Sequence, residues 1–239
     1  MPGYFLSDET INRLVQEIVQ SNREIFRTKP LDVRALEKAI KEEPSAAQSG
    51  IRHVISNFGV DIISQLDGNM PEEFMYYNDI IKTFTLPEIT KYISKRAFQF
   101  CDNLESIVIP ENVETIDEES FSECIKLRKV LFAGKSKCDL LGSEAFYHCD
   151  SLRAIALPDS LIEMDSKCFA FCSKLHTLIL PANITYIGER AFQECDSLSI
   201  LTYNGKRESF LESVTKANRW AENSSIEKIR CIDGDIIWQ

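Results

Sequence analysis

Phenylalanines and cysteines recur at one spacing along much of this 239-residue chain. The phenylalanines are Phe98, Phe121, Phe146, Phe169 and Phe192, and the cysteines are Cys101, Cys124, Cys149, Cys172 and Cys195. Both series advance by 23, 25, 23 and 23 residues. A fixed period in the twenties is typical of a solenoid, in which each repeat contacts only its neighbours. The spacing therefore predicts stacked coils in which these two residue types fill the same interior places.

Each repeat also holds a short alternating segment, as in 104–110, which usually ends at a proline. Alternation predicts a strand with one buried face, and proline ends it because proline cannot donate to a ladder. The inward residues are predicted to be Ile107, Ile109, Val130, Phe132, Ile155, Leu157, Leu178 and Leu180. A further core aliphatic follows each strand at Ile93, Ile116, Met164 or Ile187. Residues 81–87 look like the strand of a first, incomplete repeat.

Eight cysteines raise the question of disulfides. Stacked coils place equivalent residues roughly 4.8 Å apart with parallel Cβ vectors, which suits packing better than the angled geometry of a disulfide. We therefore predict buried free thiols. Cys138, Cys168 and Cys231 lie outside the regular series and lack the spacing of a zinc site.

The N-terminal part has the pattern of helices. Residues 7–24 carry apolar side chains at helical spacing, and further helices are predicted after Pro30, from Ser45 to Phe58 and over 60–66. The run 67–71 breaks the helical pattern. These observations predict a helical domain at 1–75 and a solenoid at 76–205.

The repeated pattern, Ala-Phe-x-x-Cys-x-x-Leu-x-x-Ile-x-Ile-Pro over about 79–203, resembles the BspA-like, or treponemal-type, leucine-rich repeat family. The tail from Trp220 to Trp238 resembles the ending of many bacterial and phage members. The resemblance implies an α+β fold that includes a leucine-rich-repeat solenoid, and a role in binding ligands or proteins.

The remaining residues, 206–239, are predicted to close the solenoid. A helix from about Glu208 to Glu222 would bury Phe210, Leu211, Val214 and Ala217, with Trp220 as a further candidate. Residues 229–237 have the pattern of two strands joined by a two-residue Asp233-Gly234 turn. Together they form the predicted helix-hairpin cap.

Composition limits the partners. The formal net charge of −10 argues against direct binding of nucleic acid or of an anionic membrane. The first residues show neither a basic region nor an apolar run of a signal peptide, and no segment is apolar enough to cross a membrane. We expect a cytoplasmic protein, with a virion as the alternative location.

Catalytic signals are missing from the sequence. His53, His148 and His176 stand in no context that suggests a base for a nucleophile. No phosphate-binding loop or metal-ligand motif occurs. The sequence predicts no catalytic residues, no metal and no cofactor, although a pocket built from distant residues stays open as an alternative.

The outward residues of the strands offer a better candidate site. Stacking predicts an apolar column of Val108, Leu131, Ala156 and Ile179, flanked by Thr85 and Thr202. Such a ribbon suits partner binding. Two alternatives stay open: the N-terminal helices could cover the column, or β-branched residues are there only because they suit strands.

Charge is also segregated. Six acids lie within 111–123, namely Glu111, Glu114, Asp117, Glu118, Glu119 and Glu123. Five bases follow at Lys126, Arg128, Lys129, Lys135 and Lys137, within the 25-residue repeat. The longer loop at 133–138 is therefore either functional or simply solvated. We include Lys129, Lys135 and Lys137 in the predicted partner site and treat the six acids as an acidic surface.

The leading hypothesis is a non-enzymatic protein-binding module. In its most specific form it is a bacterial or phage inhibitor that covers a partner's basic, nucleic-acid-binding surface, with the acidic run imitating phosphate. The alternative is a structural or receptor-binding component of a virion or a cell surface.

Overall fold

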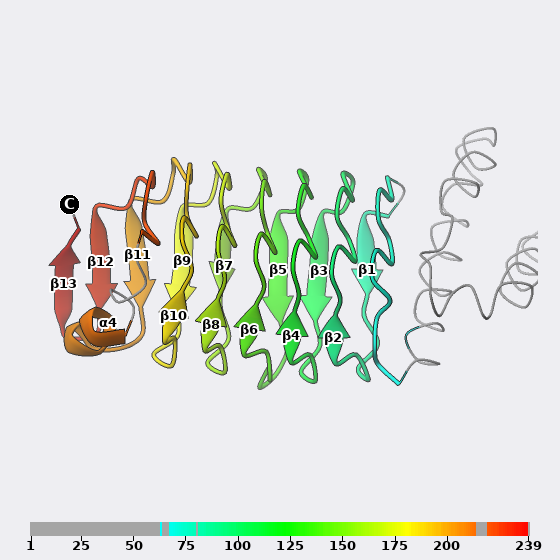
Figure 1. Cartoon of the computed structure of the whole chain (residues 1–239), viewed down its shortest axis with the longest axis horizontal. Coiled ribbons are helices and arrows are strands. Elements are labelled where there is room, and N and C mark those ends of the chain that lie inside the picture. Colours follow the sequence, from blue (N-terminus) through cyan, green and yellow to red (C-terminus); the bar gives the residue numbers. More distant parts are fainter. Residues whose placement is uncertain (1–62, 64–66, 80, 214–218, 239) are drawn as a thin grey trace, which may run out of the picture.

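The computed structural model describes residues 63, 67–79, 81–213 and 219–238. Over this part the chain winds into an elongated stack of coils (Figure 1). The predicted helices within 1–62 lie outside the described residues, and the helical domain at 1–75 stays a prediction. Because most of the described chain forms strands and turns, the described fold is a β-solenoid with little helix.

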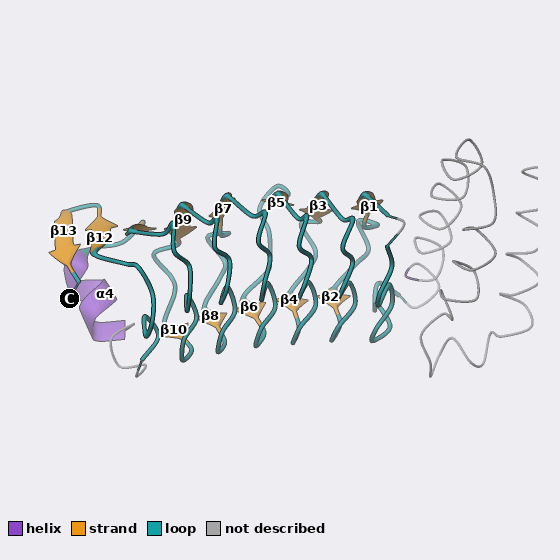
Figure 2. Ribbon diagram, turned by 90° about the horizontal axis from the view of Figure 1, so that it is seen from above, coloured by secondary structure: helices purple, strands orange, loops and turns teal. Residues whose placement is uncertain are grey.

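Long strands lie along one side of the solenoid and short strands along the other, as the view from above shows (Figure 2). We call the row of long strands the long sheet, although it consists of two separate ladders, and the row of short strands the short sheet. The long strands are β1 (Thr83–Thr85), β3 (Ser106–Ile109), β5 (Lys129–Phe132), β7 (Ala154–Ala156), β9 (Thr177–Leu180), β11 (Ile200–Tyr203) and β12 (Lys228–Cys231). The short strands are β2 (Tyr92–Ile93), β4 (Thr115–Ile116), β6 (Leu140–Leu141), β8 (Glu163–Met164) and β10 (Tyr186–Ile187). Pairing between successive coils is parallel in both sheets.

The long sheet is interrupted once. Its ladders run β1-β3-β5 and β7-β9-β11-β12-β13, where β13 is Gly234–Ile237, with no ladder between β5 and β7. The short sheet continues through the same coils, because β4 pairs with β6 and β6 with β8. The interruption falls at the single 25-residue step of the sequence, where the loop after β5 is two residues longer.

Stacked phenylalanines form the centre of the core. Phe98, Phe121, Phe146 and Phe169 lie with ring centroids 5.2–5.3 Å apart and nearly parallel planes, and all are fully buried. The predicted inward strand residues are buried as well, except Phe132, which is only partly buried. Repetition of the coil therefore repeats the same apolar filling.

All eight cysteines are free and buried, as predicted. Each thiol of the regular series donates a hydrogen bond to a backbone carbonyl of the preceding coil; for example, Cys124 Sγ lies 3.1 Å from the Phe98 oxygen and Cys149 Sγ lies 3.2 Å from the Phe121 oxygen. A thiol fits here because it packs as a small apolar group and still satisfies a buried acceptor.

The turn around each phenylalanine contains two residues in the left-handed conformation, four positions apart. Arg96 and Phe100 have φ values of 57° and 58°, and the same pair recurs in every following coil. This geometry points every second N–H group at the next coil, as in Phe98 N to Ser120 O at 2.7 Å. Ladder hydrogen bonds thus stabilise a conformation that non-glycine residues otherwise rarely adopt.

The first coil is more complete than predicted. Met75 N donates to the Ala97 oxygen and Tyr77 N to the Gln99 oxygen, so the turn is already present before β1. Met70, Phe74 and Met75 belong to the same core cluster as the solenoid. The turn is hard to detect in the sequence because Met75 and Asn78 occupy the places held later by phenylalanine and cysteine.

The C-terminal end differs from the predicted helix and hairpin. The described helix α4 spans Arg207–Ser213, and residues 219–223 form turns instead of continuing it. Arg219 and Asn223 are left-handed, and Trp220 packs edge-on against Phe192 at 5.9 Å, so this segment repeats the coil turn.

Two further details of this end differ from the prediction. Leu211 is 46% exposed instead of buried, whereas Phe210 is buried as expected; Val214 and Ala217 lie outside the described residues. β12 pairs in parallel with β11 and antiparallel with β13 (Gly234–Ile237), and the turn lies at 232–233, one residue earlier than predicted. The closing of the solenoid by this end stays a prediction.

Tight stacking of coils makes Gly188 a sensitive position. A Cβ atom at Gly188 would lie 2.3 Å from the backbone nitrogen of Ser166 in the preceding coil. We expect Gly188→Ala to lower the free energy of unfolding by about 1–3 kcal/mol, because the coils would have to separate. Urea denaturation would measure the change, with exposed Thr185→Ala in the same coil as the control. Equal effects of the two substitutions would contradict this expectation.

Candidate functional site

The outward residues of the long sheet form the predicted apolar column. Register pairs Val108 with Leu131 and Ala156 with Ile179, and continues to Thr85 and Thr202 at the two ends. The Val108 and Leu131 residues are 49% and 44% exposed. Ala156 is exposed and Ile179 is half-buried. Four of the predicted site residues are therefore aligned on one face, with the interruption of the sheet between Leu131 and Ala156.

Lys129 lies on the same face, two residues before Leu131 on β5. Lys135 and Lys137 do not lie on it, because the chain leaves β5 and crosses toward β6. Within this loop, Lys137 N donates to the Glu111 oxygen, and Lys137 Nζ lies 2.8 Å from Asn112 Oδ1. The structure thus separates the predicted partner site into a strand face and a loop between the two sheets.

The six predicted acids are spread around one coil instead of forming one surface. Five of them contact groups of their own chain, and among these Asp117 Oδ1 accepts a hydrogen bond from Glu118 N at 2.7 Å. Glu114 accepts from the Tyr92 hydroxyl at 3.1 Å, Glu118 pairs with Lys95 at 2.6 Å, Glu119 pairs with Arg96, and Glu123 Oε2 lies 3.3 Å from His148 Nδ1. Glu111 and Asp117 are exposed.

A turn edge with aromatic and charged side chains was not anticipated. Phe171 packs against Tyr147 at 5.3 Å and His148 at 5.7 Å, and Glu123 and Asp150 flank the imidazole. Burial raises the pKa of Glu123, while the nearby His148 opposes that rise. The turns that align these side chains contain pairs of left-handed residues, and none of these residues is glycine. The sequence therefore gives no sign of where such turns occur.

A second group, which the sequence predicted only in part, lies beside the apolar column. We name Lys126, Arg128, Lys129, Arg153 and Lys174 the cationic patch; all five residues are exposed. Lys129 is the first residue of β5, and the other four lie one to three residues before β5, β7 or β9. A comparison of equivalent positions in successive repeats would have detected the group, because Arg128 and Arg153 are 25 residues apart.

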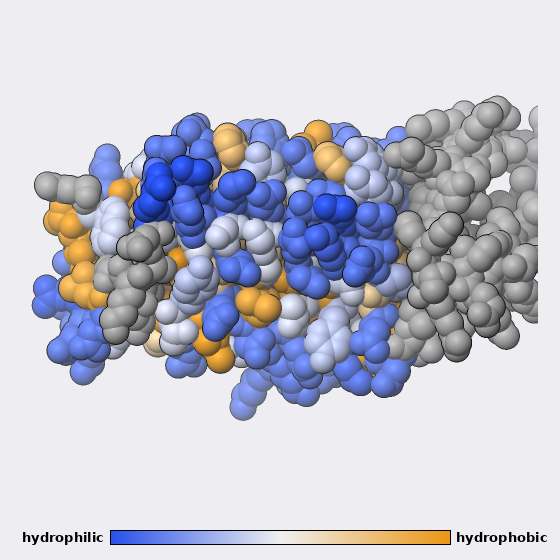
Figure 3. Space-filling view, in the orientation of Figure 1, coloured by the Kyte–Doolittle hydropathy of each residue, from blue (hydrophilic) through white to orange (hydrophobic). Residues whose placement is uncertain are grey.

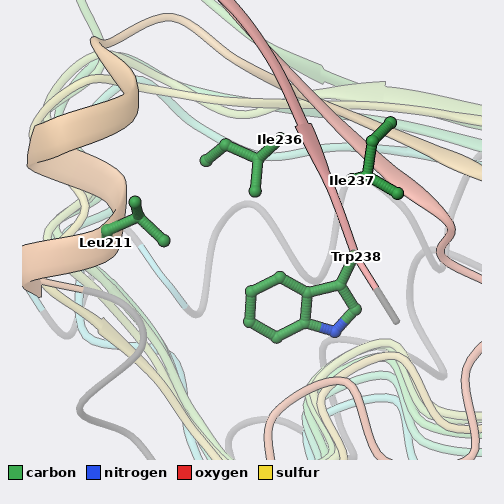
Figure 4. Close-up of a pocket in the computed structure, with 4 residues that line it drawn as sticks. All are labelled: Leu211, Ile236, Ile237 and Trp238. Atoms are coloured by element: carbon green, nitrogen blue, oxygen red, sulfur yellow. The ribbon is translucent and has the colours of Figure 1, made fainter.

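The described residues offer little for catalysis. They contain no group of three or more potential metal ligands among His, Cys, Asp and Glu side chains. His176 Nδ1 lies 2.9 Å from the hydroxyl oxygen of the adjacent Thr177, and His53 lies outside the described part. A pocket of about 540 Å³ near the C-terminal end is lined by Leu211, Ile236, Ile237 and Trp238 (Figure 4). Its lining carries no ionisable side chain.

The face that carries the short strands is mostly hydrophilic, with scattered apolar side chains (Figure 3). Exposed Ile162 and Tyr186 belong to or adjoin these strands, at 42% and 39% exposure. In the part of the chain that the structure describes, no helix has the length and apolar character needed to cross a membrane.

Comparison with known proteins supports the fold. A T. pallidum leucine-rich repeat protein of known structure is 26% identical, with a TM-score of 0.52 over 54% of this chain and 60% of its own. A leucine-rich repeat protein from Bacteroides ovatus is 20% identical, with a TM-score of 0.50 over 64% of this chain and 43% of its own. This chain thus spans less than two thirds of either protein. No curated protein sequence matches it.

The model of the BspA type leucine-rich repeat region matches in six copies, over residues 70–199 and 134–230. These matches cover more than half of the chain and coincide with the observed coils. The chain therefore belongs to the BspA-type leucine-rich repeat family.

Proposed function

We propose that this chain is a non-enzymatic protein-binding module that engages its partner through the apolar column of the long sheet. Leucine-rich repeats suggest a protein-binding module, and such repeats are typically scaffolds without enzymatic activity. The observation that carries the proposal is the exposure of Val108 and Leu131, at 49% and 44%, side by side in register. Exposed apolar side chains aligned on a rigid sheet favour association.

The column is preorganised for binding. Beneath it, Ile107 and Val130 are at most 4% exposed and pack into the continuous core. Little conformational entropy is therefore lost when a partner covers the face. Complete burial of a valine or leucine side chain contributes about 1.5–3 kcal/mol, so covering these half-exposed residues contributes part of that amount at each position.

The more specific form of the proposal is an inhibitor that covers a basic, nucleic-acid-binding surface of a bacterial or phage partner. The net charge of −10 supports it. The scattered acids of 111–123 give it less support, because five of them already contact their own chain. The alternative, a structural component of a virion or a cell surface, would be favoured by self-assembly on size-exclusion chromatography.

Substitution of the column tests the proposal. We expect Val108→Asp with Leu131→Asp to abolish capture of a stoichiometric partner from bacterial lysate, because two carboxylates would be desolvated in the interface. The unfolding temperature should change little, since both side chains already face solvent. Affinity capture followed by identification of the retained proteins would measure the loss.

Ile162→Asp with Tyr186→Asp provides the matched control on the opposite sheet, where exposure is similar. The control variant should capture the same partner as the unmodified chain. If both double variants lose the partner equally, or if neither does, the apolar column is not the binding face.

A further inference from the structure

The cationic patch stands out in an acidic chain. Most other described cations lie close to carboxylates, among them Lys91 with Asp67, Lys167 with Glu144 and Arg190 with Glu222. Among the described residues, none of the five patch members has a carboxylate within 4 Å. Lys126 instead donates to Asn103 Oδ1 at 2.6 Å. The patch therefore retains uncompensated positive charge.

The nearby acids leave this charge in place. Glu105 lies in the coil before Arg128, and its backbone oxygen accepts a hydrogen bond from Arg128 N. The carboxylate of Glu105, however, pairs with Lys82 at 3.8 Å. Burial and the nearby Asp79 raise the pKa of Asp102, and the positive charge of Lys126 lowers it by a smaller amount. Against five cations, these acids neutralise only a fraction of the charge.

The patch runs beside the apolar column through the same coils. Lys129 and Leu131 both point outward from β5, two residues apart, which places their Cα atoms about 7 Å from each other. Arg153 directly precedes β7, whose last residue is Ala156. The backbone of His176 bonds to the Arg153 oxygen, so an exposed imidazole extends the row toward β9. Two parallel stripes, one cationic and one apolar, thus cross the strands.

We propose that the strand face recognises an acidic protein segment that carries apolar side chains along one side. This inference rests on the proposed protein-binding function of the strand face, not on its more specific form as an inhibitor of a basic surface, and it specifies the chemistry of the partner at that face. The apolar residues of the segment cover Val108, Leu131 and Ile179, and its carboxylates face Arg128, Lys129 and Arg153. Opposite charge along an interface raises the association rate and selects partners.

A nucleic acid fits these observations less well. Its phosphates would match the cationic patch, but the apolar stripe offers them no partner. The remaining surface of a chain with a net charge of −10 would also repel a long polyanion. A short acidic peptide avoids both costs.

Selection from a displayed library of random peptides tests the inference with the full chain as bait. We expect the selected peptides to combine an excess of Asp and Glu with apolar residues. Arg128→Glu with Arg153→Glu should weaken the best synthetic peptide at least tenfold, in proportion to the reversal of two charges near the interface. Lys91→Glu with Lys206→Glu makes the same change in net charge elsewhere and should leave its affinity within about twofold.

Binding would be measured by fluorescence anisotropy at low and at physiological salt, where screening should weaken it. Val108→Asp with Leu131→Asp separates the acidic-segment inference from the proposed function. Peptides that need the column but show no acidic excess, or that tolerate the Arg128 and Arg153 reversal, would overturn the inference alone. Selected peptides that ignore the column would overturn the proposed function as well. A single-stranded oligonucleotide that binds the patch as tightly as the best peptide would assign the face to nucleic acid instead.

Discussion

Raising the pH from 8 to 11 should unfold the solenoid at room temperature. Burial raises the pKa of Cys138 and Cys195 to about 12, and raises the pKa values of Cys101, Cys149, Cys168 and Cys172 well above the ordinary value. In the unfolded chain the pKa of these thiols is about 8.5. The folded state therefore holds protons that the unfolded state releases in this interval.

The sign of the effect follows from linkage. The stability contributed by each raised pKa is fully present below about pH 8.5 and is lost as the pH rises toward the folded value. Once the unfolded thiols are ionised, each thiol that the folded state keeps protonated costs about 1.4 kcal/mol of stability per pH unit, so Cys138 and Cys195 together cost about 3 kcal/mol per pH unit. The four fully buried thiols add to this loss, which over the interval up to pH 11 becomes comparable with the typical stability of a domain, about 5–15 kcal/mol.

Urea denaturation at several pH values, followed by tryptophan fluorescence and far-ultraviolet circular dichroism, would measure the slope. Both tryptophans, Trp220 and Trp238, report on the C-terminal end. Cys149→Ala with Cys172→Ala should reduce the slope by about one third, whatever it does to stability at neutral pH. A slope that is the same in this variant, or a fold that persists at pH 11, would refute the role of the thiols.

The second large effect concerns the phenylalanine stack. Phe146→Ala should lower the free energy of unfolding by about 3–5 kcal/mol, because the cavity opens in the middle of the core. The ring lies 5.3 Å from that of Phe121 and 5.2 Å from that of Phe169, both nearly parallel to it, so two coil interfaces lose contacts at once. In a solenoid each such interface couples neighbouring repeats.

Phe171→Ala is the matched control. This residue lies on the turn edge of the next coil, is only half-buried and leaves the stack intact. We expect it to cost no more than about 1 kcal/mol. Chemical denaturation monitored by circular dichroism would compare the two variants. Similar losses in both would show that the stack does not dominate the stability of the coils.

The repeated residues made most of the solenoid predictable. Two series with identical steps placed Phe98 and Cys101 in the interior, and alternation separated inward Ile107 from outward Val108. These assignments rely on burial, which recurs identically in each coil. The repeat period and the alternation of inward and outward residues along each strand were enough to predict which apolar residues are exposed on the long sheet.

Features that depend on backbone conformation or on a changed period could not be predicted in the same way. The left-handed Arg96 and Phe100 have no glycine at their places that would indicate such a conformation. The pattern of the last coil favours a helix because Ala221 and Ser224 occupy the places that phenylalanine and cysteine hold in the earlier coils. The cationic patch is divided among repeats, so inspection along the chain detects only its first half.

The interruption between β5 and β7 also affects how the solenoid can deform. On the other sides of the same coils, Phe121 N still bonds to the Ala145 oxygen at 2.8 Å and β4 pairs with β6. Backbone hydrogen bonds thus hold the two coils together on those sides, whereas β5 and β7 share no strand ladder and are joined by side-chain packing. Packed side chains permit small sliding motions that a ladder forbids. We therefore expect the solenoid to bend more easily between β5 and β7 than elsewhere, so that a partner lying across Leu131 and Ala156 would restrict this bending.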